Sequence, residues 1–308
     1  MKKRLRRLGL VLTVAAAVFL TFGAIYIWNF FTEPFASASS TFQGGASWDG
    51  ETPFHLLWLD VSGGFALLSL NPTQQSFTVV NLPLGEGKLY QGEDGLNLAA
   101  EEALRLLGVP VDGYLLVGEE GVSQLRSLFP EAAGVKDFIK LGSILQLPAV
   151  WGVARENLRT DLDIPEILQV LWYLFRVRSD RVNLVSPSPG LFADPKALDL
   201  ELSLFFRDEK IVAEHLKIQV LNGSGKPGRA ASAARIIRNF GGEVIRTDNF
   251  ERQDLVKGYL LLESSGSYTA RRLAEIFDVS DSRPPRMGSE ARAEITLILG
   301  REDAHSAS

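Results

Sequence analysis

Residues 219–232, QVLNGSGKPGRAAS, contain the spacing in this chain that is most typical of a chemical function. Gly223, Gly225 and Gly228 fit the pattern G-x-G-x-x-G, with an apolar, strand-like run before them and an alanine-rich, helical stretch after them. Asp248 follows 20 positions after the last glycine. In a dinucleotide-binding turn of this form, backbone N–H groups at the helix N-terminus bind the pyrophosphate and the acidic residue binds the ribose. The pattern therefore allows two interpretations, a cofactor site or a tight turn between strand and helix.

Other side chains that could do chemistry are scarce. The chain has no cysteine, which excludes disulfides, thiolate metal sites and cysteine nucleophiles. The three histidines, His55, His215 and His305, are far apart in sequence, so a multi-histidine metal site would need all three to converge. His55 stands in the apolar run FHLLWLDV and is predicted to be a strand residue.

The N-terminus predicts a membrane anchor. Five positive charges in residues 2–7 precede 24 residues, 8–31, that contain no ionised side chain. About 20 apolar residues span a bilayer, and the positive-inside bias places the short basic end in the cytoplasm. We therefore expect a cytoplasmic stub and transmembrane helix over 1–32, on a single-pass protein of the bacterial cytoplasmic membrane whose bulk is extracytoplasmic. The small residues Ala36-Ser-Ala38 keep a cleaved signal peptide open as the alternative.

The charge distribution argues against a nucleic-acid partner. From residue 8 to residue 215 the chain carries 13 basic and 25 acidic residues, whereas residues 216–303 carry 14 and 12. Nucleic-acid binding rests on neutralisation of phosphates by lysine and arginine, which an acidic region does not supply.

The order of elements predicts two α/β domains after a flexible spacer at 33–53, which is rich in serine, glycine and alanine. Residues 54–214 read as an α/β/α sandwich. Its strands are expected at 55–61, 65–72, 76–83, 113–118 and, before a turn, in 180–190; its helices are expected at 96–110, 121–129, 163–177 and 198–211, the last being ambiguous between helix and strand. Residues 215–303 read as a small βαββαβ α+β domain, compatible with a split βαβ arrangement in which a third strand separates the two parallel ones. A loop is expected at 280–291 and a disordered tail at 304–308.

At this level the chain resembles the LytR-CpsA-Psr family of bacterial envelope proteins. The segment IQVLNGSGKPGRAASAARIIRNFGGEVI resembles the start of its LytR C-terminal domain, with a strand, Asn-Gly, a glycine turn, an alanine-rich helix and a glycine before the next strand. The segment AEITLILGRED resembles the closing strand of that domain with its Gly-x-x-Asp. FHLLWLD, ALLSLNPTQQSFTVVNLP and LRTDLDIPEILQVLWYLFRV resemble segments of the family's core domain, here at 54–214. The resemblance implies transfer of glycopolymers from a polyprenyl-pyrophosphate carrier to the cell wall, with arginines on the pyrophosphate and aspartates that hold Mg²⁺ or act as acid and base.

The positions that the family uses for this chemistry are changed in this chain. The aspartate before the second strand falls on Gly63, and the arginine and aspartate after the third strand fall on Leu84 and Gly85. Asp60 ends the first strand, where members often carry an aspartate, and is the one remaining candidate. The expected arginine-rich segment is replaced by KLGSILQLPAVWGVAREN, and nearby Arg155 and Arg159 do not align with the family's arginines. A reaction that expels a pyrophosphate needs fixed cations and a metal, so we expect a degenerate core domain.

The leading hypothesis is therefore a membrane-anchored, non-catalytic binding or scaffold protein of cell-envelope assembly that needs no cofactor. Its expected partners are the membrane, cell-wall polymer or polyprenyl-phosphate lipid, and envelope proteins. The alternative is an active glycopolymer transferase, which would require Mg²⁺. Transcriptional attenuation, the older view of the family, gains no support because only about seven residues are expected in the cytoplasm.

The glycine motif is then best explained as a turn. Pro227 removes one N–H donor from the loop, and the domain is too short for two mononucleotide-binding halves. Nicotinamide cofactors are also scarce outside the membrane. Asn222 and the three glycines supply turn chemistry and close approach. The alternative for Asn222, Gly223, Gly225 and Gly228 is a helix N-terminus that binds an anionic group of the wall, and we expect no dinucleotide.

Overall fold

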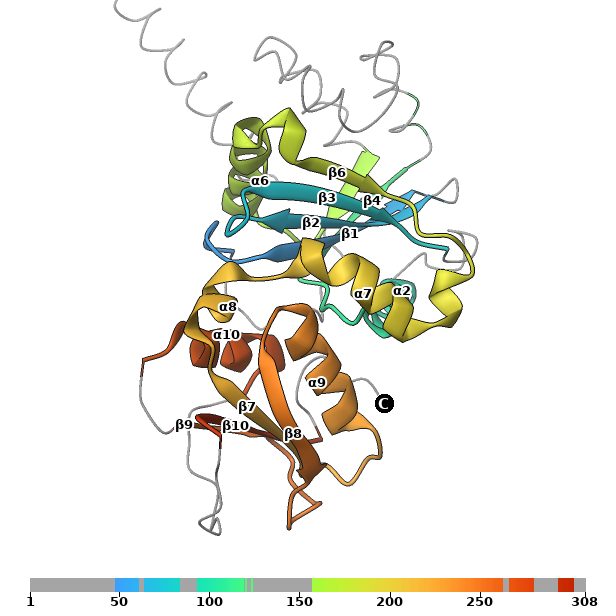
Figure 1. Cartoon of the computed structure of the whole chain (residues 1–308). Coiled ribbons are helices and arrows are strands. Elements are labelled where there is room, and N and C mark those ends of the chain that lie inside the picture. The colour runs from blue at the N-terminus through green and yellow to red at the C-terminus, as the bar shows by residue number, and fades with distance from the viewer. Residues whose placement is uncertain are drawn as a thin grey trace, which may run out of the picture.

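The computed structural model describes residues 48–60, 64–83, 93–118, 120, 123, 157–262, 266–279 and 293–301. These residues form two α/β domains stacked one on the other (Figure 1). Among them, no helix is both long enough and apolar enough to cross a bilayer. The predicted anchor, most of the helix predicted at 121–129, the 280–291 loop and the 304–308 tail lie outside the described residues.

The first domain is built on a six-stranded mixed sheet with the order β5-β4-β1-β2-β3-β6. Its strands are β1 Phe54–Asp60, β2 Phe65–Asn71, β3 Ser76–Asn81, β4 Gly113–Val117, β5 Leu158–Thr160 and β6 Val182–Val185. Strand β1 runs parallel to β4, β3 runs parallel to β6, and β2 is antiparallel to both of its neighbours. The five predicted strands are confirmed. The three-residue β5 was not predicted, because it is too short to show an alternating pattern.

Helices cover both faces of this sheet, as predicted for an α/β/α sandwich. The helices α2 Glu93–Leu107 and α7 Pro195–Phe206 lie on one face, and α6 Ile164–Arg176 lies on the other (Figure 1). Along β1, Leu57 and Leu59 pack with α2 and α7, whereas Leu56 packs toward α6. Alternation along a strand sends successive side chains to opposite faces, so one short strand contributes to two cores.

Helix α6 begins at a complete capping box. The Asp163 side chain accepts from the Glu166 N–H, and the Glu166 carboxylate accepts from the Asp163 N–H. The other Glu166 oxygen accepts from the backbone N–H of Trp48 at 3.1 Å, and the buried Trp48 ring stacks on Phe54. Residues 48–53 were expected to belong to the flexible spacer, and this packing against α6 shows that they belong to the folded domain.

The second domain has a four-stranded sheet with the order β8-β7-β10-β9. Its strands are β7 Lys217–Asn222, β8 Glu243–Asn249, β9 Tyr259–Leu262 and β10 Ile295–Leu299, and its helices are α9 Arg229–Asn239 and α10 Tyr268–Phe277. Both helices pack into one core on the same face of the sheet. The predicted βαββαβ order is confirmed.

The split βαβ arrangement was wrong, because β7 and β8 are direct parallel neighbours. The burial of the strands gives the physical reason. Strand β10 is buried along its whole length and β7 nearly so, which suits the two central places, while β8 is exposed at most positions and suits an edge. The charged and polar composition of β8, EVIRTDN, therefore decides its place in the sheet.

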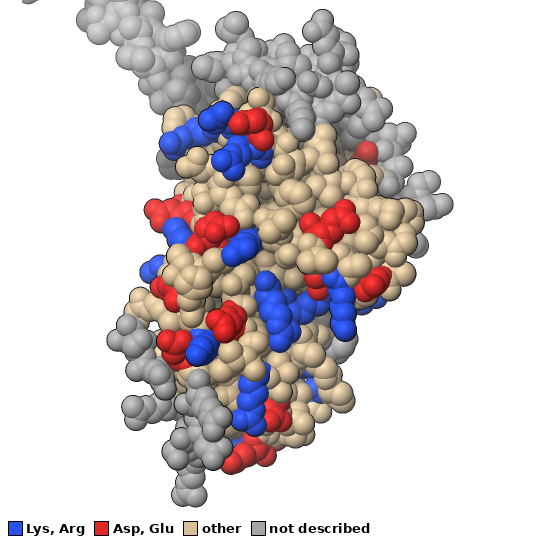
Figure 2. All heavy atoms as spheres, viewed as in Figure 1, with Lys and Arg blue, Asp and Glu red and all other residues tan. Residues whose placement is uncertain are grey.

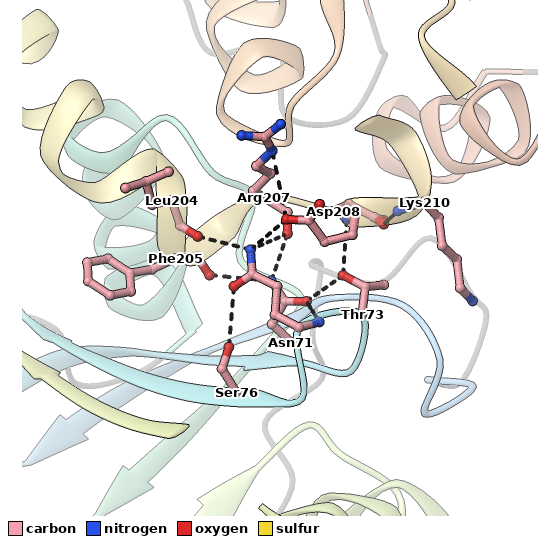
Figure 3. A network of polar contacts seen from close by, with 10 residues as sticks. Asn71, Thr73, Ser76, Leu204, Phe205, Arg207, Asp208 and Lys210 are labelled. Atoms are coloured by element: carbon pink, nitrogen blue, oxygen red, sulfur yellow. Dashed lines mark hydrogen bonds and ion pairs between the residues drawn. The ribbon is translucent and has the colours of Figure 1, made fainter. Parts of the chain in front are cut away.

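The segment predicted as one helix over 198–211 is helical but broken at Arg207 and Asp208, between α7 and α8 Glu209–Glu214. The β2–β3 turn supports this break (Figure 3). Asn71 Nδ2 donates to the Arg207 carbonyl at 2.9 Å, and the Glu209 N–H donates to Thr73 Oγ1 at 3.2 Å. Because helix ends leave backbone groups without intrahelical partners, these bonds fix the point where the chain passes into the second domain.

Candidate functional site

The carboxyl ends of the parallel strands β1, β3, β4 and β6 meet at one edge of the large sheet. Asp60 ends β1 and lies opposite Val117 of β4, while Asn81 ends β3. Asn81 Nδ2 donates to Ser186 Oγ, just beyond β6, at 2.7 Å. Ligands of open α/β sheets bind outside the carboxyl ends of the strands, so this edge is the candidate site of the first domain.

Asp60 lies at this edge with its side chain partly exposed. Its N–H donates to the Gly64 carbonyl at 2.8 Å, which closes the β1–β2 connection. Asp60 alternates with Leu59 and therefore points to the face of the sheet that carries α6. The other family positions, Gly63, Leu84 and Gly85, lie outside the described residues.

Arg159 of β5 does not join Asp60. Arg159 lies opposite Leu116, and Leu116 lies opposite Leu59, so these three side chains point to one face of the sheet. Asp60 belongs to the neighbouring row and points to the other face. Arg159 is therefore separated from Asp60 by the sheet itself, and Arg155 lies outside the described residues.

The described residues also contain no group of three or more histidine, aspartate or glutamate side chains that could hold a metal ion. Asp60 supplies a carboxylate at this edge, and Mg²⁺ is usually held by one or two carboxylates together with waters and substrate phosphates.

The glycine loop of the second domain connects β7 to α9, as the sequence predicts. Asn222 Oδ1 accepts from the Ser224 N–H at 3.1 Å and from Ser224 Oγ at 2.7 Å, and Asn222 Nδ2 donates to the Lys226 carbonyl at 2.7 Å. Gly225 has φ +75°, and a Cβ there would lie 2.6 Å from the Gln253 carbonyl oxygen. A Cβ on Gly223 would lie 2.5 Å from the Leu255 side chain. These two glycines allow close packing against the neighbouring loop.

The remaining parts of the motif also have local explanations. Gly228 has φ +85° and is the N-cap of α9, with open space where its Cβ would lie. The Asp248 carboxylate accepts from Arg246 Nη2 at 2.6 Å. The Asn222 side chain is hydrogen-bonded to Ser224 and Lys226 within the loop, and Asp248 is paired with Arg246. The loop therefore has the geometry of a turn that its own side chains stabilise. The structure also explains why glycine stands at positions 223 and 225: both lie against residues 253–255, a contact that the spacing of the motif does not reveal.

Buried polar groups gather where the two domains meet. His55 is fully buried in β1, as predicted for a strand residue, and its ring contacts the rings of Phe206 and Phe240 edge-on. Its Nδ1 lies 3.4 Å from Asp112 Oδ2, and its backbone N–H donates to the same oxygen at 2.7 Å. The Arg272 guanidinium, from α10, donates to the Pro53 carbonyl at 2.7 Å. The contacts of His55 are those of a packed junction residue, and sequence reasoning could not place Phe240 beside it.

Comparisons with known proteins give a family match to the second domain. Residues 215–302 match the family model described as LytR cell envelope-related transcriptional attenuator. No curated protein matches the chain in sequence. Solved structures similar to this chain include B. subtilis TagT, which is 11% identical in sequence and has a TM-score of 0.34. The match covers 54% of this chain and 99% of TagT. B. subtilis TagV has 13% identity, 49% and 98% covered, and a TM-score of 0.35. The protein gbs0355 from Streptococcus agalactiae has 14% identity, 44% and 77% covered, and a TM-score of 0.34. Residues 215–302 of this chain are therefore a C-terminal domain of the LytR cell envelope-related family.

Proposed function

We propose that this chain is a membrane-anchored, extracytoplasmic protein of cell-envelope assembly that binds or scaffolds envelope components and does not transfer glycopolymer. The LytR-type domain at 215–302 supports the envelope role. The basic residues 2–7 and the uncharged run 8–31 support the anchor and the orientation. Its partners on this proposal are the membrane, wall polymer or polyprenyl-phosphate lipid, and other envelope proteins.

One observation carries the non-catalytic part of the proposal. The three positions where the resemblance requires an aspartate, an arginine and an aspartate hold Gly63, Leu84 and Gly85, none of which can ionise. A pyrophosphate leaving group needs preorganised cations, and loss of a metal carboxylate together with the phosphate clamp removes the main stabilisation of the transition state. Arg159 lies on the face of the sheet opposite to Asp60 and does not restore the clamp.

Asp60 is the observation that favours the alternative, an active transferase. It is a carboxylate at the carboxyl end of β1, the place where the fold presents residues to a ligand. On that alternative Asp60 would bind Mg²⁺ or act as acid or base, with cations supplied from residues outside the described ranges.

The test is a transfer assay with the full chain in lipid nanodiscs, a polyprenyl-pyrophosphate-linked glycan and a wall acceptor, with and without Mg²⁺. We expect no turnover, together with retention of isolated wall polymer by the immobilised chain. Turnover that is lost on removal of Mg²⁺ and in Asp60→Ala, but kept in Glu201→Ala at an exposed site on α7, would establish the transferase instead. Absence of both turnover and polymer retention would contradict the wall-polymer role.

A further inference from the structure

Helix α6 presents an apolar stripe to the solvent. Leu168 is 44% exposed, Trp172 is 65% exposed and Phe175 is 44% exposed. Their spacing of i, i+4 and i+7 places them on one side of the helix, while Ile167 and Val170 bury the opposite side against the sheet. Three large apolar side chains on one exposed face mark an interaction surface.

Basic residues stand at the C-terminal end of this stripe. Arg176, Arg178 and Arg181 lie on or just after the last turn of α6, with Asp180 as the acidic residue among them, paired to Arg178 at 3.0 Å. The Arg176 guanidinium lies 5.8 Å from the Trp172 ring centroid. Figure 2 shows basic side chains gathered beside one acidic group at the upper end of the molecule, where α6 lies in Figure 1. Tryptophan and arginine side by side on an amphipathic helix are typical of a membrane interface.

The exposed leucines of α7 provide a contrast within the same domain. Leu200 and Leu204 are also strongly exposed, but the exposed charged residue beside Leu200 is the acidic Glu201, and Asp199 on its other side is paired with Arg235 of α9. An acidic flank is repelled by an anionic bilayer, whereas a basic flank gains about 1 kcal/mol per residue near its surface. Charge therefore singles out α6 from the two helices.

The path of the chain brings α6 close to the predicted anchor. The Trp48 N–H is bonded to Glu166 in the first turn of α6, and the Trp48 ring contacts Tyr173 edge-on at 5.9 Å. Residues 33–47, which separate the predicted anchor from Trp48, span at most about 54 Å when extended and about 21 Å as a flexible coil. The chain from the membrane therefore arrives at this helix.

We propose that α6 lies on the outer surface of the bilayer, with Leu168, Trp172 and Phe175 in the boundary between headgroups and acyl chains. The arginines at its C-terminal end then contact anionic lipid headgroups. This inference rests on the membrane anchoring in the proposed function. Because α6 covers the face of the sheet opposite to α2 and α7, the LytR-type domain, which packs beneath those two helices, points away from the membrane (Figure 1).

The absence of cysteine makes a site-specific test direct. The full chain with Leu168→Cys, labelled with an environment-sensitive fluorophore, is reconstituted in phosphatidylcholine vesicles with and without phosphatidylglycerol and with brominated lipid as quencher. Leu200→Cys on α7 is the matched control, a leucine at an exposed helical site on the opposite layer. We expect a blue shift and about threefold stronger quenching at residue 168 than at 200, reduced when phosphatidylglycerol is omitted or Arg176 and Arg181 are replaced by glutamine.

Each other outcome overturns the proposal in a distinguishable way. Equal quenching at the two positions, with the chain retained on vesicles after a carbonate wash, contradicts docking of α6 but leaves the anchor intact. Removal of the chain by the wash contradicts the anchor and, with it, the docking. A blue shift in vesicles that brominated lipid does not quench shows that protein covers the stripe. The cover is a second copy if the shift disappears at a high lipid-to-protein ratio, and the chain's own residues if it does not. Trp172→Ser in the Leu168→Cys background, checked for folding by circular dichroism, should weaken the quenching.

Discussion

Arg235 of α9 forms a bidentate ion pair with Asp199 of α7, in which Nε and Nη2 each lie 2.7 Å from a carboxylate oxygen. The same guanidinium donates to the carbonyl oxygens of Arg105 at 2.7 Å and Leu106 at 2.8 Å, at the C-terminal end of α2. Helix C-terminal carbonyls lack intrahelical partners and favour a cation. One side chain of the LytR-type domain therefore binds two helices of the first domain.

We expect Arg235→Ala to lower the free energy of unfolding by about 1–3 kcal/mol, because it leaves Asp199 and two helix-end carbonyls without their donor. Arg235→Lys should recover only part of the loss, since an ammonium cannot reproduce the planar fork. Urea denaturation followed by tryptophan fluorescence measures both. Arg252→Ala is the matched control, because Arg252 pairs with Asp254 on the exposed surface of the same domain. A loss in the control as large as in Arg235→Ala would contradict a special role for the contact between domains.

Gly108 provides a second test of the junction. It has φ +61°, and a Cβ there would lie 2.6 Å from Asn239 Nδ2 and 2.8 Å from Arg235 Nε. Asn239 Nδ2 donates to the carbonyls of Leu107 and Gly108 at 3.0 and 3.1 Å. Gly108→Ala should therefore lower the free energy of unfolding by about 2–4 kcal/mol, because it places an alanine in a left-handed conformation and also displaces these two donors.

Gly50→Ala separates the two costs. Gly50 has φ +74°, but no atom lies within 4 Å of the site of its Cβ. We expect about 1–2 kcal/mol from the backbone alone. Thermal unfolding of both variants measures the difference, and equal losses would show that the contact between Gly108 and α9 contributes nothing.

The elements of both domains could be predicted because local patterns specify them. Helix α6 shows this most clearly, since Asp163, Pro165 and Glu166 mark its start and the apolar spacing marks its length. The pairing of strands could not be predicted in the same way. The split arrangement failed because β8 takes its place through burial relative to β7 and β10, which depends on all of the strands together.

In the candidate site, too, the positions of residues on their elements could be predicted, whereas the contacts between elements could not. The place of Asp60 at the end of β1 followed from the apolar run that precedes it. That Arg159 points to the opposite face could not be foreseen, because it depends on the register of β5 against β4. The contact of Gly225 with Gln253 likewise joins residues that no local spacing relates. Sequence patterns thus locate residues on elements, and register decides which of them meet.

The glycine loop should behave as a turn in solution. Asn222→Ala removes three hydrogen bonds at a buried position and should cost about 1–3 kcal/mol. Asn222→Asp keeps the acceptor but sets a carboxylate oxygen against the Lys226 carbonyl oxygen, so it should cost at least as much. Gly225→Ala should destabilise more than Gly228→Ala, because both have positive φ but only Gly225 meets a backbone oxygen. Calorimetric titration should detect no NADH binding, and a Kd in the micromolar range that is lost in Gly225→Ala would restore the cofactor interpretation.

Helix α10 should make the junction sensitive to acid. Glu214 of α8 accepts from the N–H groups of Tyr268 and Thr269, both at 2.8 Å, in the first turn of α10. Burial alone raises the pKa of the Glu214 carboxyl, but the hydrogen bonds from Thr269 and Tyr268 and the charge of Arg271 outweigh it and hold the pKa below its usual value. A depressed folded-state pKa means that this stabilisation is complete above the unfolded pKa of about 4.3 and is lost as the pH falls through the folded value.

Glu214→Gln should therefore lower the free energy of unfolding at pH 7 by about 1 kcal/mol, a modest figure because the carboxylate is partly exposed to solvent. The gap between variant and parent should close as the pH falls below about 4, since the protonated parent then loses the same charge. Glu201→Gln, at an exposed site on α7, is the control and should show no such pH dependence. Thermal unfolding across pH 3 to 7 measures the gap, and a difference that stays constant down to pH 3 would mean that Glu214 acts by shape and not by its charge on the α10 N-terminus.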